Sequence, residues 1–94
     1  MSGEHDIRAV DVRVHGDVQA VGYRYSAMRR ADELDVSGWG ANEPDGTVSA
    51  HLEGLGYKVD ALLEWMRRGT KWTHVRRVDV APGAVEGFEG FATR

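Results

Sequence analysis

The segment 14–24 holds the residues of this sequence that are best suited to bind an anion. It reads VHGDVQAVGYR and joins an alternating apolar pattern to a helical one. Helix starts leave backbone N–H groups without partners, which Ser, Thr, Asp or Asn usually caps. Here Ala20, Val21 and Gly22 offer no capping oxygen, and Arg24 lies where the helix dipole disfavours a cation. A bound anion would resolve both features, since loop N–H groups and a guanidinium could hold it together.

A simpler interpretation of the same segment stays open. Residues 16–22 could be only a connection, with Arg24 as an ordinary surface side chain. The segment is not a Walker P-loop, because no Gly-Lys-Ser/Thr follows. Nor is it a dinucleotide fingerprint, because its glycines are only Gly16 and Gly22. Spacing alone does not decide between an anion site and a connection.

Asn42 is the second residue that could do chemistry. It is the only asparagine of the chain and precedes the turn signal EPDG at 43–46. Its carbonyl could accept a hydrogen bond from a water while its NH₂ group donates elsewhere. A structural Asx-turn is the alternative, and the residues alone favour it.

The elements that position these residues follow from apolar periodicity, which alternates in strands and recurs at three and four residues in helices. Expected strands begin at Ile7 and cover 36–42, 47–53, 75–80 and 88–92, and expected helices cover 23–34 and 57–68. This order is the ferredoxin-like split βαβ unit, an α+β fold. We expect an antiparallel sheet of four to five strands with both helices on one face.

Two strands carry finer expectations. The apolar phase slips between Val75 and Val78, which predicts a bulge or an edge strand. In the strand at 47–53, apolar residues alternate with a polar set that we expect on the exposed sheet face. That polar set consists of Thr47, Ser49, His51 and Glu53.

Composition limits the remaining classes of function. The chain has 94 residues, no cysteine and a net charge of −3. We expect a single domain over 7–94 after a flexible segment 1–6. A disulfide framework, thiolate catalysis and cysteine-based zinc sites are excluded. The histidines lack metal-ligand spacing on a helix, so we expect neither a metal nor a cofactor.

Charge and hydropathy predict the surroundings of the protein. The negative balance argues against broad electrostatic binding of nucleic acid. No apolar run is long enough for a transmembrane helix, and residues 1–6 do not resemble a secretory signal. We therefore expect a cytoplasmic protein without nucleic-acid or membrane partners, and nothing in the sequence demands more than a monomer.

Three motifs resemble the acylphosphatase family. HGDVQAVGYR at 15–24 is similar to the family loop G-x-V-Q-G-V-G-[FY]-R. GWGAN at 38–42, followed by Asp45-Gly46, is similar to the family's second motif, and GFEGF at 87–91 to its usual ending. The resemblance covers about 7–94 and implies a metal-independent enzyme that hydrolyses acyl phosphates to a carboxylate and inorganic phosphate.

The resemblance also implies site residues. Arg24 would bind the phosphoryl group, and Asn42 would hold the attacking water. The backbone N–H groups that would share the phosphoryl group belong to Val18, Gln19, Ala20, Val21 and Gly22. Inorganic phosphate or sulfate would then compete with the substrate for this loop.

Ala20 departs from the family pattern, which usually has glycine there. If the backbone at this position has a positive φ, alanine costs on the order of 1 kcal/mol. We then expect Ala20→Gly to raise stability, activity or both, and an unchanged variant would indicate a negative φ.

Two functions without catalysis are alternatives to the enzyme. A catalytically weak domain of the same family could serve as an anion-binding or interaction module, and Ala20 keeps that alternative open. An RNA-binding sheet of similar topology would need stacking aromatic residues on the exposed sheet face. The polar set at 47–53 does not supply them.

Overall fold

The computed structural model describes residues 6–19 and 22–94. Its elements are β1 (Ile7–Asp17), α1 (Tyr23–Leu34), β2 (Ser37–Asn42), β3 (Val48–Leu55), α2 (Gly56–Arg68), β4 (His74–Pro82) and β5 (Phe91–Thr93). The order confirms the predicted βαββαβ pattern with a fifth strand. The expected flexible segment 1–6 lies outside the described residues except for Asp6.

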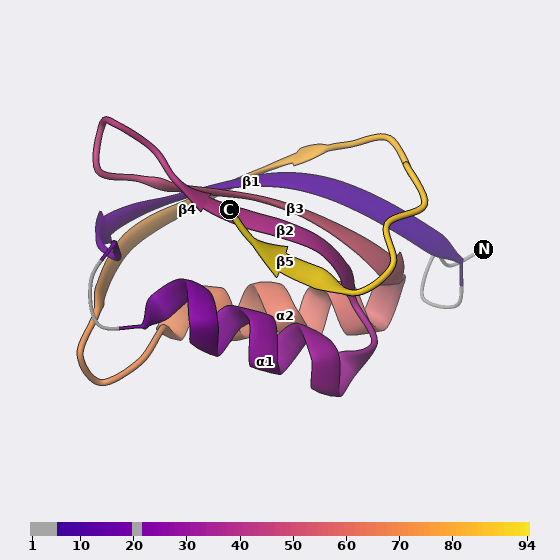
Figure 1. Cartoon of the computed structure of the whole chain (residues 1–94), viewed down its shortest axis with the longest axis horizontal. Helices are drawn as coiled ribbons and strands as arrows, with labels where there is room; N and C mark the ends of the chain where they lie inside the picture. Colours follow the sequence, from indigo (N-terminus) through magenta and orange to yellow (C-terminus); the bar gives the residue numbers. More distant parts are fainter. Residues whose placement is uncertain (1–5, 20–21) are drawn as a thin grey trace.

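One five-stranded sheet, in the order β4-β1-β3-β2-β5, has both helices on one face (Figure 1). Three strand pairs are antiparallel, but β5 pairs with β2 in parallel. The expected antiparallel sheet is therefore wrong at this edge, and the sheet is mixed. The reason is that β4 and β5 lie at opposite edges, so residues 83–90 must cross the sheet rather than turn back beside β4.

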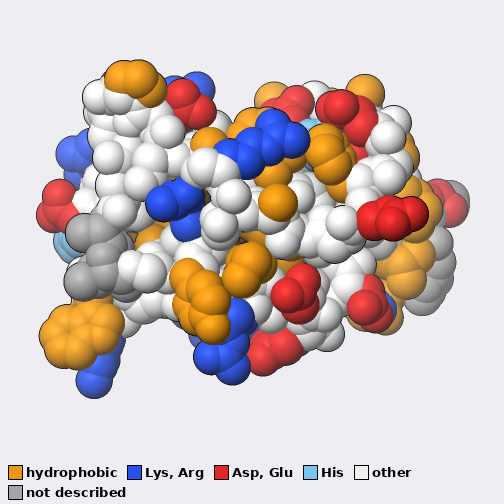
Figure 2. All heavy atoms as spheres, viewed as in Figure 1, with side chains coloured by type: hydrophobic (Ala, Val, Ile, Leu, Met, Phe, Trp, Pro, Cys, Tyr) orange, Lys and Arg blue, Asp and Glu red, His pale blue; other side chains and the backbone are white. Residues whose placement is uncertain are grey.

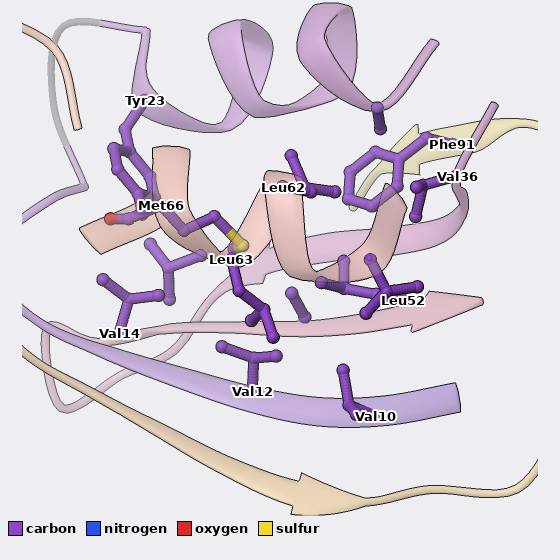
Figure 3. Close-up of a cluster of buried hydrophobic side chains, with 14 of the residues drawn as sticks. Val10, Val12, Val14, Tyr23, Val36, Leu52, Leu62, Leu63, Met66 and Phe91 are labelled. Atoms are coloured by element: carbon purple, nitrogen blue, oxygen red, sulfur yellow. The ribbon is translucent and has the colours of Figure 1, made fainter. Parts of the chain in front are cut away.

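The core lies between the helices and the sheet (Figure 3). Its largest fully buried members include Tyr23 from α1, Leu62 and Met66 from α2, and Leu52 from β3. The apolar stripes predicted for both helices face this core. The hydroxyl of Tyr23 donates to the carbonyl of Met66 at 2.8 Å, which ties the start of α1 to the end of α2.

The predicted irregularity of the fourth strand is confirmed. His15 pairs with Arg77 but Gly16 pairs with Val75, so Arg76 is the extra residue of a bulge. Gly16 has a φ of 132°, and a Cβ there would lie 2.0 Å from the carbonyl oxygen of His74. Only glycine fits at this point, where β1 leads into the connection to α1.

The second face of the sheet differs from expectation. Thr47, Ser49, His51 and Glu53 are all buried, with exposed fractions of 9% or less. The placement on an exposed face is therefore wrong. His51 and Glu53 are covered by the segment 83–90, hereafter the C-terminal segment, whose backbone N–H groups at 86–88 donate to the carboxylate of Glu53 and whose Phe88 ring lies 5.5 Å from that of His51. Thr47 and Ser49 instead form hydrogen bonds with side chains of the β2–β3 turn, Asp45 and Glu43.

The surface carries both signs of charge. On the face shown in Figure 2, acidic and basic side chains are intermixed and form no continuous basic patch. None of the helices in the described part of the chain is long and apolar enough to cross a membrane.

Candidate active site

The segment that leads from β1 into α1 is held at both ends. Val18 is 1% exposed and belongs to the hydrophobic core, so its side chain anchors the first part of the loop. Gly22 is the N-cap of α1, with a left-handed φ of 78° and no hydrogen bond from a described side chain. The predicted absence of a side-chain cap is confirmed. Ala20 and Val21 lie outside the described residues.

Gln19 joins this loop to the β2–β3 turn. Its side-chain NH₂ group donates to the carbonyl oxygens of Glu43 at 2.6 Å and Thr47 at 2.8 Å. Glu43 directly follows Asn42, so the contact brings the loop beside the end of β2. The end of β1, the start of α1 and this turn lie at the same end of the molecule (Figure 1). The family motif includes Gln19, but the sequence carries no signal for this role of its side chain.

Arg24 points to the C-terminal end of the chain. Its Nη1 donates to the backbone carbonyl oxygen of Arg94 at 2.5 Å. The guanidinium lies beside a hollow of about 130 Å³ lined by Gln19, Gly22, Tyr23, Arg24, Tyr25 and Thr93. Because a guanidinium has five N–H donors, the contact with Arg94 leaves most of them for a ligand.

Asn42 is exposed at the end of β2. It pairs with Val48, as Gly40 pairs with Ala50, and both partners belong to the core. Side chains alternate along a strand, so Asn42 lies on the helix-covered face of the sheet, as the start of α1 does. Its side chain makes no hydrogen bond to another described residue. Asp45 instead accepts the hydrogen bond from the backbone N–H of Thr47, at 3.0 Å, that defines the Asx contact of this turn.

Two series of hydrogen bonds connect the elements that carry the expected site residues. Gln19 links the loop to the turn, as described above. Arg24 reaches Arg94, whose own N–H donates to the carbonyl of Gly40 at 2.8 Å, two residues before Asn42. Asn42 itself does not line the hollow at Arg24. Thr93 and Arg94 escaped the sequence analysis because no residue type or spacing distinguishes them, and only the parallel pairing of β5 brings them here.

Charged groups near the turn are fixed by hydrogen bonds. The side-chain and backbone hydrogen bonds from Thr47 lower the pKa of Asp45, and Arg13 at 3.4 Å acts in the same direction. On the helix side, burial raises the pKa of the Tyr23 hydroxyl, which therefore stays protonated and donates to Met66. Among the described residues, no group of three or more His, Asp or Glu side chains could hold a metal ion.

A family model, curated relatives and a solved structure name the same family. The family model "Acylphosphatase" matches residues 10–93. An acylphosphatase of Nocardioides sp. is 50% identical over 86 residues, covering 92% of this chain and 87% of its own. One of Bordetella parapertussis is 50% identical over 78 residues, covering 83% and 82%. The solved structure of an acylphosphatase from Coxiella burnetii matches with a TM-score of 0.89 at 31% identity, covering 94% and 93%.

Proposed function

Because this chain belongs to the acylphosphatase family and is an enzyme that hydrolyses acyl phosphates, we propose which residues carry the reaction. Arg24 and the backbone N–H groups of 18–22 bind the phosphoryl group, and Asn42 holds the attacking water. The observation that carries the proposal is the start of α1. There a helix N-terminus without a side-chain cap, a guanidinium and a hollow of about 130 Å³ occur together.

The chemistry of the substrate suits this small set of groups. The water oxygen forms a new bond to phosphorus while the bond between phosphorus and the acyl oxygen breaks. The electron pair of that bond leaves with the carboxylate, and the water gives up a proton as inorganic phosphate forms. A carboxylic acid has a pKa of about 4–5, by analogy with Asp and Glu, so the leaving group needs no general acid.

Arg24 and the loop then supply charge stabilisation. Negative charge is spread over the oxygens of the phosphoryl group in the transition state, and fixed donors aimed at these oxygens lower its energy. The hydrogen bond to Arg94 fixes one nitrogen of the guanidinium before substrate binds. Preorganisation of this kind avoids the cost of orienting a long side chain during the reaction.

Asn42 contributes position rather than charge. Its side chain has no hydrogen-bonding partner among the described residues, and it lies on the same side of the sheet as α1. The amide oxygen can accept a hydrogen bond from a water and thereby orient the water's lone pair towards phosphorus.

The test measures release of carboxylate and phosphate from a synthetic acyl phosphate with EDTA present. We expect Arg24→Ala to weaken binding of substrate and of inorganic phosphate, and Asn42→Ala to lower turnover by about 10²-fold or more while phosphate still binds. Arg29→Ala, which removes an exposed guanidinium from the same helix, is the matched control. An Asn42→Ala variant with unchanged turnover, or a requirement for a metal, would contradict the assignment.

A further inference from the structure

The C-terminal segment is attached to a buried carboxylate. Glu53 is 4% exposed, and its carboxylate accepts hydrogen bonds from the N–H groups of Glu86 at 2.5 Å, Gly87 at 3.0 Å and Phe88 at 3.3 Å. Its Oε2 also lies 2.7 Å from Nε2 of His51. Removing a carboxylate from water is costly unless such partners compensate it. The arrangement therefore holds the segment at a defined place on the sheet.

A continuous series of contacts leads from Glu53 to the candidate active site. The ring of Phe88 lies 5.5 Å from the ring of His51 and 5.8 Å from the guanidinium of Arg94. The carbonyl of Arg94 in turn accepts the hydrogen bond from Arg24. Because each of these contacts joins two neighbouring groups, we expect a displacement of Phe88 to move Arg94 and, through it, the guanidinium of Arg24.

The strand β5 is too short to fix Arg94 by itself. It has three residues, pairs with β2 on one side only, and buries only the side chain of Phe91. Ala92, Thr93 and Arg94 are exposed. Short edge strands contribute little independent stability. Arg94 is also held by its backbone N–H, which donates to the carbonyl of Gly40 at 2.8 Å, and by its guanidinium, which lies 4.6 Å from the ring of Trp39 besides its contact with Phe88.

We propose that Glu53 is a positioning residue for acyl phosphate hydrolysis. Its carboxylate holds the C-terminal segment so that the Arg94 carbonyl meets the Arg24 guanidinium and orients it towards the phosphoryl group. The inference rests on the proposed role of Arg24. Glu53 touches no substrate, so its effect appears in phosphate binding and passes entirely through Arg24.

The experiment is a double-mutant cycle with Glu53→Gln and Arg24→Ala in the full chain. It measures the Kd for inorganic phosphate by calorimetry, and KM and kcat for a synthetic acyl phosphate, at a temperature where every variant is folded. We expect Glu53→Gln alone to raise Kd and KM about fivefold, with kcat changed less than about twofold. In the Arg24→Ala background the same substitution should change Kd no further.

Two additional variants separate positioning from general stability. Glu64→Gln makes the same chemical change at an exposed position of α2 and should leave Kd unchanged. Phe88→Leu keeps an apolar side chain but loses the aromatic contact with Arg94. It should raise Kd about twofold, again only when Arg24 is present. If Glu53→Gln does not fold, the Phe88→Leu cycle decides the inference.

The outcomes distinguish this inference from the proposed function. If Arg24→Ala weakens phosphate binding but Glu53→Gln and Phe88→Leu do not, the positioning role is overturned and the role of Arg24 stands. Equal effects of Glu53→Gln in both backgrounds would also overturn it. If Arg24→Ala itself binds phosphate as the unmodified protein does, both the proposed role and this inference fail.

Discussion

The two faces of the sheet are both covered, but by different means. On one face, α1 and α2 bury apolar side chains such as Val14, Leu52 and Leu62. On the other, the C-terminal segment covers His51 and Glu53 without forming regular structure. The first face is held by apolar packing and the second by hydrogen bonds to buried charged groups. The difference matters because the candidate active site receives parts from both sides.

Buried polar groups on the second face fix the position of the C-terminal segment more than they add to the free energy of unfolding. His51 lies between two carboxylates, with Nδ1 2.7 Å from Asp11 and Nε2 2.7 Å from Glu53. Such a cluster satisfies its members only in one arrangement, whereas apolar side chains tolerate small shifts. A segment with few buried side chains can therefore be placed well enough to reach Arg24.

The largest loss of stability is expected from a substitution on the helix-covered face. Leu62 is fully buried, so Leu62→Ala should lower the free energy of unfolding by about 3 kcal/mol through lost burial and a cavity. Urea unfolding followed by circular dichroism measures this loss. Phosphate affinity of the folded fraction should change little, because Leu62 does not line the hollow at Arg24. A loss below about 1 kcal/mol would mean that this face is not held by packing.

A single substitution on the covered polar face should lower the free energy of unfolding by less than Leu62→Ala does. Glu53→Gln leaves backbone N–H groups of the C-terminal segment facing an amide, and we expect a loss of about 2 kcal/mol in the same urea experiment. Hydrogen exchange should accelerate at 86–88 and stay slow in α2. Uniform acceleration across the chain would show that the C-terminal segment does not open separately from the helix-covered face.

The pH dependence of stability should sharpen the contrast. Burial alone would raise the pKa of Glu53, but the hydrogen bonds from the backbone N–H groups of Glu86, Gly87 and Phe88 and from His51 together outweigh it and lower that pKa. Burial alone would lower the pKa of His51, but the hydrogen bonds to Asp11 and Glu53 outweigh it and raise that pKa.

The directions of these two pKa shifts determine how the stability of the protein changes at low and at high pH. The contribution of Glu53 is present above its ordinary pKa of 4.5 and is lost as pH falls through the lowered value. The contribution of His51 is present below its ordinary pKa of 6.5 and is lost as pH rises through the raised value. The stability difference between the unmodified protein and a His51→Gln, Glu53→Gln variant should therefore be largest between these two values. A difference that does not vary with pH would contradict the charged state of the cluster.

The smallest loss of stability is expected at the edge of the helix-covered face. Val80 on β4 pairs with the core residue Val12 and therefore lies on this face, but it is 38% exposed. Val80→Thr should change the free energy of unfolding by less than about 0.5 kcal/mol. A loss comparable with that of Glu53→Gln would show that β4 is also covered in solution.

Much of the fold was predictable because its helices and strands are visible as local patterns of apolar residues. The stripes of α1 and α2 and the alternation of β1 and β3 each state which side chains share a face. The bulge at Arg76 was visible as a slip in the apolar phase. The alternation in β3 correctly grouped His51 with Glu53 but placed them on an exposed face, since a strand's own pattern says nothing of what another segment lays over it.

The candidate site divides in the same way. The motif from Gly16 to Arg24 and the position of Asn42 were evident from residue types, spacing and family resemblance. The roles of Gln19, Thr93 and Arg94 were not, because each depends on a partner more than twenty residues away in the chain.

The amino-acid sequence by itself determined the elements, their apolar faces and the uncapped helix start with its arginine. These depend on periodicity and local backbone chemistry, which a sequence displays directly. Only the tertiary structure decided that β5 pairs in parallel beside β2, that Glu53 is buried under the C-terminal segment, and that Arg94 meets Arg24. Such contacts join distant parts of the chain, and their geometry follows from how the whole sheet is ordered rather than from any residue's neighbours.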